Sequence, residues 1–142
     1  MMAAVATKLK KATFKHIEAE LYCYYDTLRG IEQIRKDIMY NKEIDENIGG
    51  GRSNIPSKLT ERIATAIIMN KMLQQLEAIT EAIRSVYERL PDEKKQLVQL
   101  KYWTKQQYSW EEIAEQLHVS KRQAIRWRNE IVYAIAEKLG WR

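Results

Sequence analysis

Apolar residues recur every three or four positions along two long stretches of this 142-residue chain. Because an α-helix completes a turn in about 3.6 residues, this spacing places each set on one helix face. We therefore predict one helix over residues 10–40 and a second over residues 58–90, which ends before Pro91. The apolar stripe of the first helix continues through Gly30 and consists of Phe14, Ile17, Leu21, Tyr24, Leu28, Ile31, Ile34 and Ile38.

Two such helices are too long to bury their apolar stripes alone. At about 1.5 Å per residue, a helix of about thirty residues is about 45 Å long. The sequence predicts that residues 1–90 form a coiled-coil-like antiparallel helical hairpin used for oligomerisation or interaction. Apolar surface left over on it predicts a homodimer or a higher homo-oligomer. The alternative is a monomeric bundle in which both helices pack against the C-terminal helices.

A loop is predicted between these helices, over residues 41–58. This stretch holds three successive glycines, Gly49 to Gly51, a proline and several Asn, Asp and Ser residues, all of which favour turns. A phosphate-binding loop would need a Lys after the last glycine and a preceding strand. Neither is present in the sequence, so a hinge, a DNA-backbone contact and an oligomer contact are the roles left open.

Composition favours helices, and charge is concentrated at the C-terminal end. Gly and Pro number only five and two, and the net charge is +5. Residues 121–142 hold six basic and two acidic residues, which is most of this excess. The single cysteine, Cys23, the lack of an apolar leader and the lack of a long apolar run predict a cytoplasmic protein with no membrane partner.

The region 91–142 predicts a helix-turn-helix domain. A short helix follows Pro91 and ends near Thr104. Ser109 with Glu112, and Ser120 with Gln123, have the spacing of two capping boxes, each of which marks the start of a helix. His118 stands in the turn between these helices, where glycine is common, and histidine is among the residues enriched at positive φ.

The helix that starts after Ser120 has the pattern of a DNA-recognition helix. Ala124, Trp127, Ile131 and Ile135 are predicted to face inward. Arg and Lys can pair with guanine and Gln with adenine, while an apolar side chain can meet a thymine methyl. We predict double-stranded DNA as a partner, with base contacts by Lys121, Arg122, Gln123, Ile125 and Arg126 and phosphate contacts by Lys101, Lys105, Ser109 and Arg128. The alternative is that these basic residues only solvate a surface helix.

Two segments of this region carry a family resemblance. "LPDEKKQLVQLKYW" and "SWEEIAEQLHVSKRQAIRWRNEIVYAIAEKL" resemble the C-terminal DNA-reading domain of bacterial sigma factors. With "ATFKHIEAELYCYYDTLRGIEQIRKDIMY", "NIGGGRSN" and "TERIAT", nearly the whole chain resembles the RinA/ArpU group of phage and prophage transcriptional regulators. The resemblance implies an activator of phage late genes for packaging and morphogenesis that acts in a bacterial host cell, with host RNA polymerase as a further partner. Because no core-polymerase-binding sigma region is recognisable, it implies an accessory activator.

Two other functions are alternatives to this interpretation. A small terminase subunit, which is a DNA-packaging adaptor, also joins a helix-turn-helix to a long helical hairpin and assembles as a ring. An enzyme is not predicted, because the sequence has neither a carboxylate pair beside a histidine nor a His/Cys cluster with metal-ligand spacing. No catalytic residue, metal or cofactor is therefore expected. The predicted fold class is all-α throughout.

Overall fold

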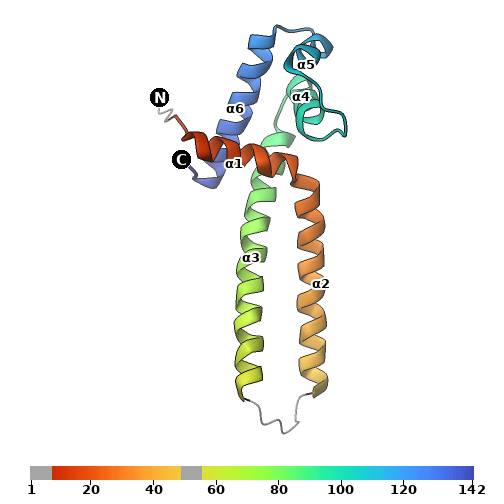
Figure 1. Ribbon diagram of the computed structural model, residues 1–142, viewed down its shortest axis with the longest axis vertical. Helices are drawn as coiled ribbons and strands as arrows, with labels where there is room; N and C mark the ends of the chain where they lie inside the picture. The colour runs from red at the N-terminus through yellow and green to blue at the C-terminus, as the bar shows by residue number, and fades with distance from the viewer. Residues whose placement is uncertain (1–7, 49–55) are drawn as a thin grey trace. The chain divides into compact units, whose positions relative to one another are not determined.

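The computed structural model describes residues 8–48 and 56–142, and all of the regular structure in these ranges is α-helical (Figure 1). The predicted all-α class is confirmed. The helices are α1 (Lys11–Tyr22), α2 (Tyr24–Ile48), α3 (Pro56–Glu88), α4 (Asp92–Tyr102), α5 (Trp110–Leu117) and α6 (Lys121–Leu139). None of the described helices is both long and apolar enough to cross a membrane.

The chain forms two compact units. The first unit contains residues 1–24 and 81–142, and the second unit contains residues 25–80. The first unit therefore includes α1 and the last turns of α3 together with α4, α5 and α6. This division differs from the boundary at residues 90 and 91 that the sequence suggested, because α1 packs with the C-terminal helices.

The single helix predicted over residues 10–40 is wrong. The chain forms two helices there, and α1 ends at Cys23, whose backbone N–H donates to the Ala19 carbonyl at 3.0 Å. The boundary between the two units falls directly after this break. The apolar stripe continues across the break, but its two parts are buried in different units. Ile17 and Leu21 belong to the core of the first unit, whereas Ile31 is buried in the second. Gly30, by contrast, lies inside α2.

The loop predicted over residues 41–58 is also too long. Helix α2 continues to Ile48, and α3 starts at Pro56, a residue that suits the first turn of a helix because that turn needs no N–H donor. The glycines at 49–51 lie outside the described residues. The end of the second predicted helix agrees better with the structure, because α3 ends at Glu88, shortly before Pro91.

The core of the first unit lies where α1, α4, α5 and α6 meet the last turns of α3. In Figure 1, α1 crosses α6, and the contact includes an edge-to-face pair between Phe14 and Tyr133 with ring centroids 6.1 Å apart. Trp103 donates its indole N–H to the Leu21 carbonyl at 2.9 Å. The most deeply buried large side chains are Ile17, Leu21, Ile83, Leu97, Val98, Ile113, Val132 and Ile135.

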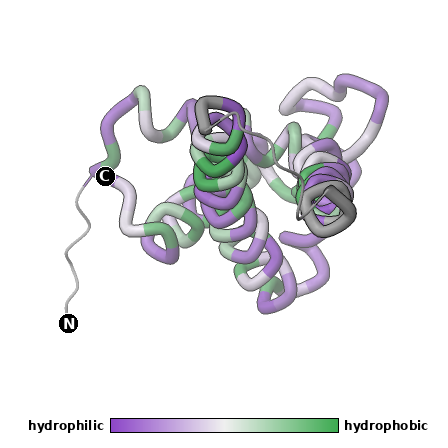
Figure 2. Tube along the Cα trace, turned by 90° about the horizontal axis from the view of Figure 1, so that it is seen from below, coloured by the Kyte–Doolittle hydropathy of each residue, from purple (hydrophilic) through white to green (hydrophobic). Residues whose placement is uncertain are grey.

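The second unit consists of α2 and the first part of α3. Arg35 of α2 pairs with Glu77 of α3, and residues from both helices line a groove between Ile38 and Met69. Figure 2 shows hydrophobic and hydrophilic residues interspersed along the helical trace. Ile31 is buried, but many apolar side chains of this unit are exposed.

Candidate nucleic-acid interface

Helix α5 begins at a complete capping box. The Glu112 backbone N–H donates to Ser109 Oγ at 3.2 Å, and the Ser109 backbone N–H donates to Glu112 Oε1 at 2.9 Å. These two bonds satisfy donors that the first turn of a helix otherwise leaves without partners. The predicted box is thus confirmed, and it sets where the short helix α5 begins.

The connection from α5 to α6 is a turn of three residues, 118–120. His118 has the left-handed backbone conformation, with φ 58° and ψ 41°, as the sequence predicted. This conformation lets the Val119 backbone N–H donate to the Ala114 carbonyl at 3.0 Å, which closes the end of α5. The chain then enters α6 at Lys121.

Helix α6 starts at Ser120, whose Oγ accepts a hydrogen bond of 3.0 Å from the Gln123 backbone N–H. Only this half of the predicted second capping box forms, because the Gln123 side chain does not return a bond to the Ser120 backbone. One bond from the Ser side chain is enough to cap the helix. The Gln123 amide, which is half-buried, is consequently not used in the cap.

The two faces of α6 differ in exposure. Ala124, Ile131 and Ile135 are buried, as predicted, while Trp127 is only half-buried. Of the residues predicted to contact bases, Lys121, Arg122 and Arg126 are exposed, and Gln123 and Ile125 are half-buried. The first turns of α6 therefore present three cations to solvent from a helix whose opposite face is anchored in the core.

Lys121 is engaged within the unit by a residue of α5. Its Nζ lies 2.7 Å from Glu111 Oε1. This hydrogen bond is the main reason that the pKa of Glu111 lies below its ordinary value. A polyanion that approached Lys121 would have to compete with a carboxylate that is already there.

The four residues predicted to contact phosphates lie in different surroundings. Lys105 and Ser109 are exposed, although Ser109 also caps α5. Lys101 is half-buried, with its Nζ over the rings of Tyr22 and Trp110 at 5.6 and 5.3 Å from their centroids. Such cation–π contacts leave part of the ammonium group accessible to an anion.

Arg128 differs from the other three because its guanidinium belongs to an internal cluster. Its Nη1 donates to Glu18 Oε2 at 3.0 Å, and the Tyr102 hydroxyl donates to the same oxygen at 2.5 Å. The guanidinium carbon also lies 5.0 Å from the ring centroid of Phe14 and 5.1 Å from that of Trp110. Sequence spacing alone could not reveal this role, because Glu18 is 110 residues away along the chain.

The Tyr102 hydroxyl is a neutral donor in this cluster. Burial raises its pKa well above the usual range, and the hydrogen bond to Glu18 raises it further. Tyr102 therefore keeps its proton across the pH range in which proteins are stable. With two donors on one carboxylate oxygen, the cluster joins α1, α4 and α6 of the first unit.

The partition of charge between the units was not foreseen from the sequence. Residues 1–24 and 81–142 contain 16 basic and 11 acidic residues, whereas residues 25–80 contain eight of each. The whole net charge of +5 thus belongs to the first unit. Part of the excess comes from four exposed lysines at the start of the described chain, Lys8, Lys10, Lys11 and Lys15, which the prediction of DNA contacts did not include.

All of the regular structure in the described residues is α-helical. In the first unit, the first turns of α6 carry exposed basic residues. Residues 22–137 match the family described as "Protein of unknown function (DUF722)", and this chain belongs to that family. The match extends from the start of α2 almost to the end of α6. No curated protein and no solved structure matches the chain.

Proposed function

We propose that this protein binds double-stranded DNA in a sequence-specific way through a helix-turn-helix made of α5 and α6. The observation that carries the proposal is the exposure of Lys121, Arg122 and Arg126 on the first turns of α6, opposite a buried face. A recognition helix needs this arrangement, because its N-terminal residues reach base edges while its other side is held by the domain. The capped three-residue turn before α6 supports the same proposal.

The charge distribution supports a polyanionic partner for the first unit. A DNA-binding domain gains affinity when cations replace the counterions condensed on phosphates. The excess of +5 lies entirely in the unit that contains α6. Within the predicted contacts, Gln123 and Ile125 complete the base-reading set, and Lys101, Lys105 and Ser109 form the phosphate-contacting set. Arg128 is left out of that set because Glu18 holds its guanidinium.

The biological role that we propose is activation of phage late genes for packaging and morphogenesis. This step depends on the resemblance to RinA/ArpU regulators, which also makes host RNA polymerase a proposed partner. Footprinting on the regulatory region of the parent genome, with and without host polymerase, tests it. A discrete protected site that polymerase extends would support activation, whereas uniform weak protection would contradict sequence-specific binding.

A small terminase subunit is the second candidate, and the exposed apolar surface of the second unit is the observation that favours it. A packaging adaptor would assemble as a ring through such a surface and would contact the large terminase. The mass of the assembly separates the two functions. A ring of many subunits favours the packaging adaptor, and a dimer favours the transcription activator.

A further inference from the structure

The second unit exposes many large apolar side chains to solvent. Five large apolar residues of α3 have between 48% and 59% of their surface exposed, namely Leu59, Ile63, Ile67, Ile68 and Met72. On α2, Met39 and Tyr40 are exposed by 60% and 63%. We call these seven side chains the apolar surface of the second unit.

This surface includes a length of α3 that carries no charge. Between Arg62 and Lys71 the sequence is "IATAIIMN", which is eight uncharged residues. Met69 is half-buried, and the other seven are exposed. Helices that are apolar on most sides are normally found buried against other elements. Large contiguous apolar patches on a soluble protein mark interaction sites.

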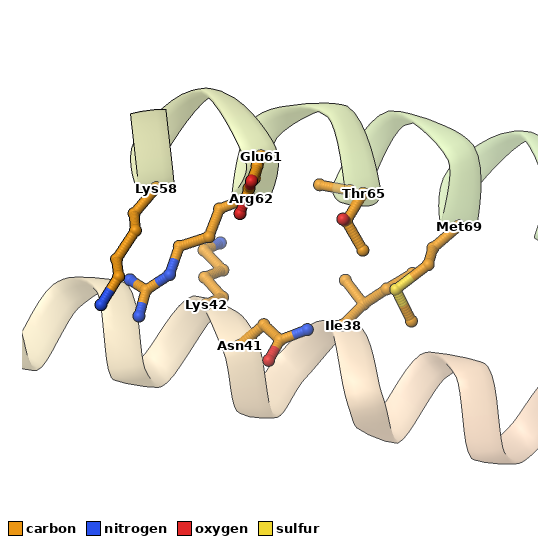
Figure 3. Close-up of a pocket in the computed structure, with 9 residues that line it drawn as sticks. Ile38, Asn41, Lys42, Lys58, Glu61, Arg62, Thr65 and Met69 are labelled. Carbon is orange, nitrogen blue, oxygen red and sulfur yellow. The ribbon is translucent and has the colours of Figure 1, made fainter. Parts of the chain in front are cut away.

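Helix α2 covers only one side of this length of α3. The groove between the helices has a volume of about 620 Å³, and its apolar wall is formed by Ile38, Ala66 and Met69 (Figure 3). Ile63 and Ile67 do not line the groove. Figure 3 shows Lys42, Lys58 and Arg62 gathered at the other end of it. Within the part of the second unit whose side chains the structure describes, the exposed isoleucines are therefore not covered.

Electrostatics indicate what covers the apolar surface. With eight basic and eight acidic residues, the second unit has no net charge to attract DNA or an anionic membrane. Charges of both signs alternate along α2 in Asp26, Arg29, Glu32, Arg35, Lys36 and Asp37. Most of these charges are paired within the unit, as in Arg29 with Asp26, Arg35 with Glu77 and Lys36 with Glu32. A surface without net charge does not repel another copy of itself, which a two-fold interface requires.

The exposed area also fits a second copy. Seven half-exposed large side chains at roughly 100 Å² each offer at most roughly 700 Å², against the roughly 800 Å² per partner of a standard stable interface. Because Ile63 and Met72 lie nine residues apart, on opposite sides of α3, a second copy must contact more than one face of that helix to cover them. We infer that two copies of this chain associate through the apolar surface of their second units. The inference uses only residues of the second unit, so it stands or falls independently of the DNA proposal for the first.

Sedimentation velocity of the full chain over a range of micromolar concentrations tests the inference. We expect the unaltered protein to sediment as a dimer or larger assembly. Ile63→Glu places a charge in the apolar surface and should weaken association at least tenfold, with the helical circular dichroism signal retained because Ile63 is exposed within one copy. Ile67→Glu should do the same.

Gln96→Glu is the matched control. It introduces the same charge at an exposed position of α4, which belongs to the first unit and so lies outside the apolar surface. This variant should associate like the unaltered protein, and so should Ile63→Leu, which keeps the side chain apolar. If Ile63→Glu loses its helical signal, cross-linking of the unaltered and Ile63→Leu proteins still measures association directly.

Three results would overturn the inference. One is an unaltered protein that stays monomeric at every concentration. Another is an unchanged assembly in both Ile63→Glu and Ile67→Glu, and the third is equal weakening by Ile63→Glu and Gln96→Glu. In the first case, binding of neutral lipid vesicles through the same residues would assign the apolar surface to a membrane.

Discussion

Arg128 Nη1 lies 3.0 Å from Glu18 Oε2, so α6 is held to α1 by an ion pair inside the first unit. The two side chains are only 18% and 19% exposed. Removing one member of a shielded pair leaves the other charge without a partner. We expect Arg128→Ala to lower the free energy of unfolding by about 1–3 kcal/mol, as urea denaturation would measure.

Tyr102→Phe is the control for this pair, because it removes only the second hydrogen bond to Glu18. Its expected cost is smaller, about 1 kcal/mol. Arg128→Ala should also leave the DNA affinity of the folded protein nearly unchanged. A large loss of DNA affinity with unaltered stability would instead assign Arg128 to a phosphate.

Glu111→Gln is expected to strengthen DNA binding. The Glu111 carboxylate lies 2.7 Å from Lys121 Nζ and repels phosphates that approach the start of α6. Its removal should tighten binding to specific and random DNA alike, because the gain is electrostatic. Fluorescence anisotropy at two salt concentrations measures it. Glu115→Gln removes the same charge from another exposed position of α5 and should have a smaller effect; equal effects would show that Lys121 is not involved.

The same carboxylate should make stability depend on pH on the acid side. The pKa of Glu111 in the folded protein is lower than its ordinary value of 4.5, chiefly because Lys121 donates to it. The contribution is therefore complete above pH 4.5 and is lost as the pH falls through the lowered pKa. We expect the melting temperatures of the unaltered protein and Glu111→Gln to converge toward pH 3. A constant difference would contradict this assignment.

His118 offers a test of the turn between α5 and α6. Its φ of 58° costs an ordinary L-residue about 1–2 kcal/mol, and glycine avoids that cost. His118→Gly is expected to change stability by less than about 1 kcal/mol, whereas His118→Val should destabilise by about 1–2 kcal/mol. Thermal unfolding of both variants provides the measurement. Equal stability of the two would mean that the turn relaxes to another conformation.

Arg122 and Arg126 should affect DNA binding differently from Lys105. If either arginine reads a guanine, its change to Ala should cost about 1–3 kcal/mol at the specific site and little on random DNA. Lys105→Ala should weaken binding to all sequences alike and reduce the salt slope by about one. Gel-shift titrations with specific and random duplexes measure both. Equal losses on the two duplexes for Arg122→Ala and Arg126→Ala would contradict base reading.

Local signals in the sequence predicted the features whose causes are themselves local. The capping serine at 109, the positive φ of His118, the start of α6 and the end of α3 before Pro91 each depend on residues a few positions apart. Backbone sterics and cap hydrogen bonds act over that range, so the sequence by itself determined these elements and the all-α class.

Tertiary packing decided what the periodic pattern could not. The apolar stripe of residues 14–38 shows no break at Cys23, yet its two parts are buried in different units. Arg128 has the spacing of a surface cation, but Glu18, which also accepts from Tyr102, holds it inside the first unit. Periodicity reports which face of a helix is apolar and not which partner covers that face, because burial is a property of contacts between residues that are distant along the chain.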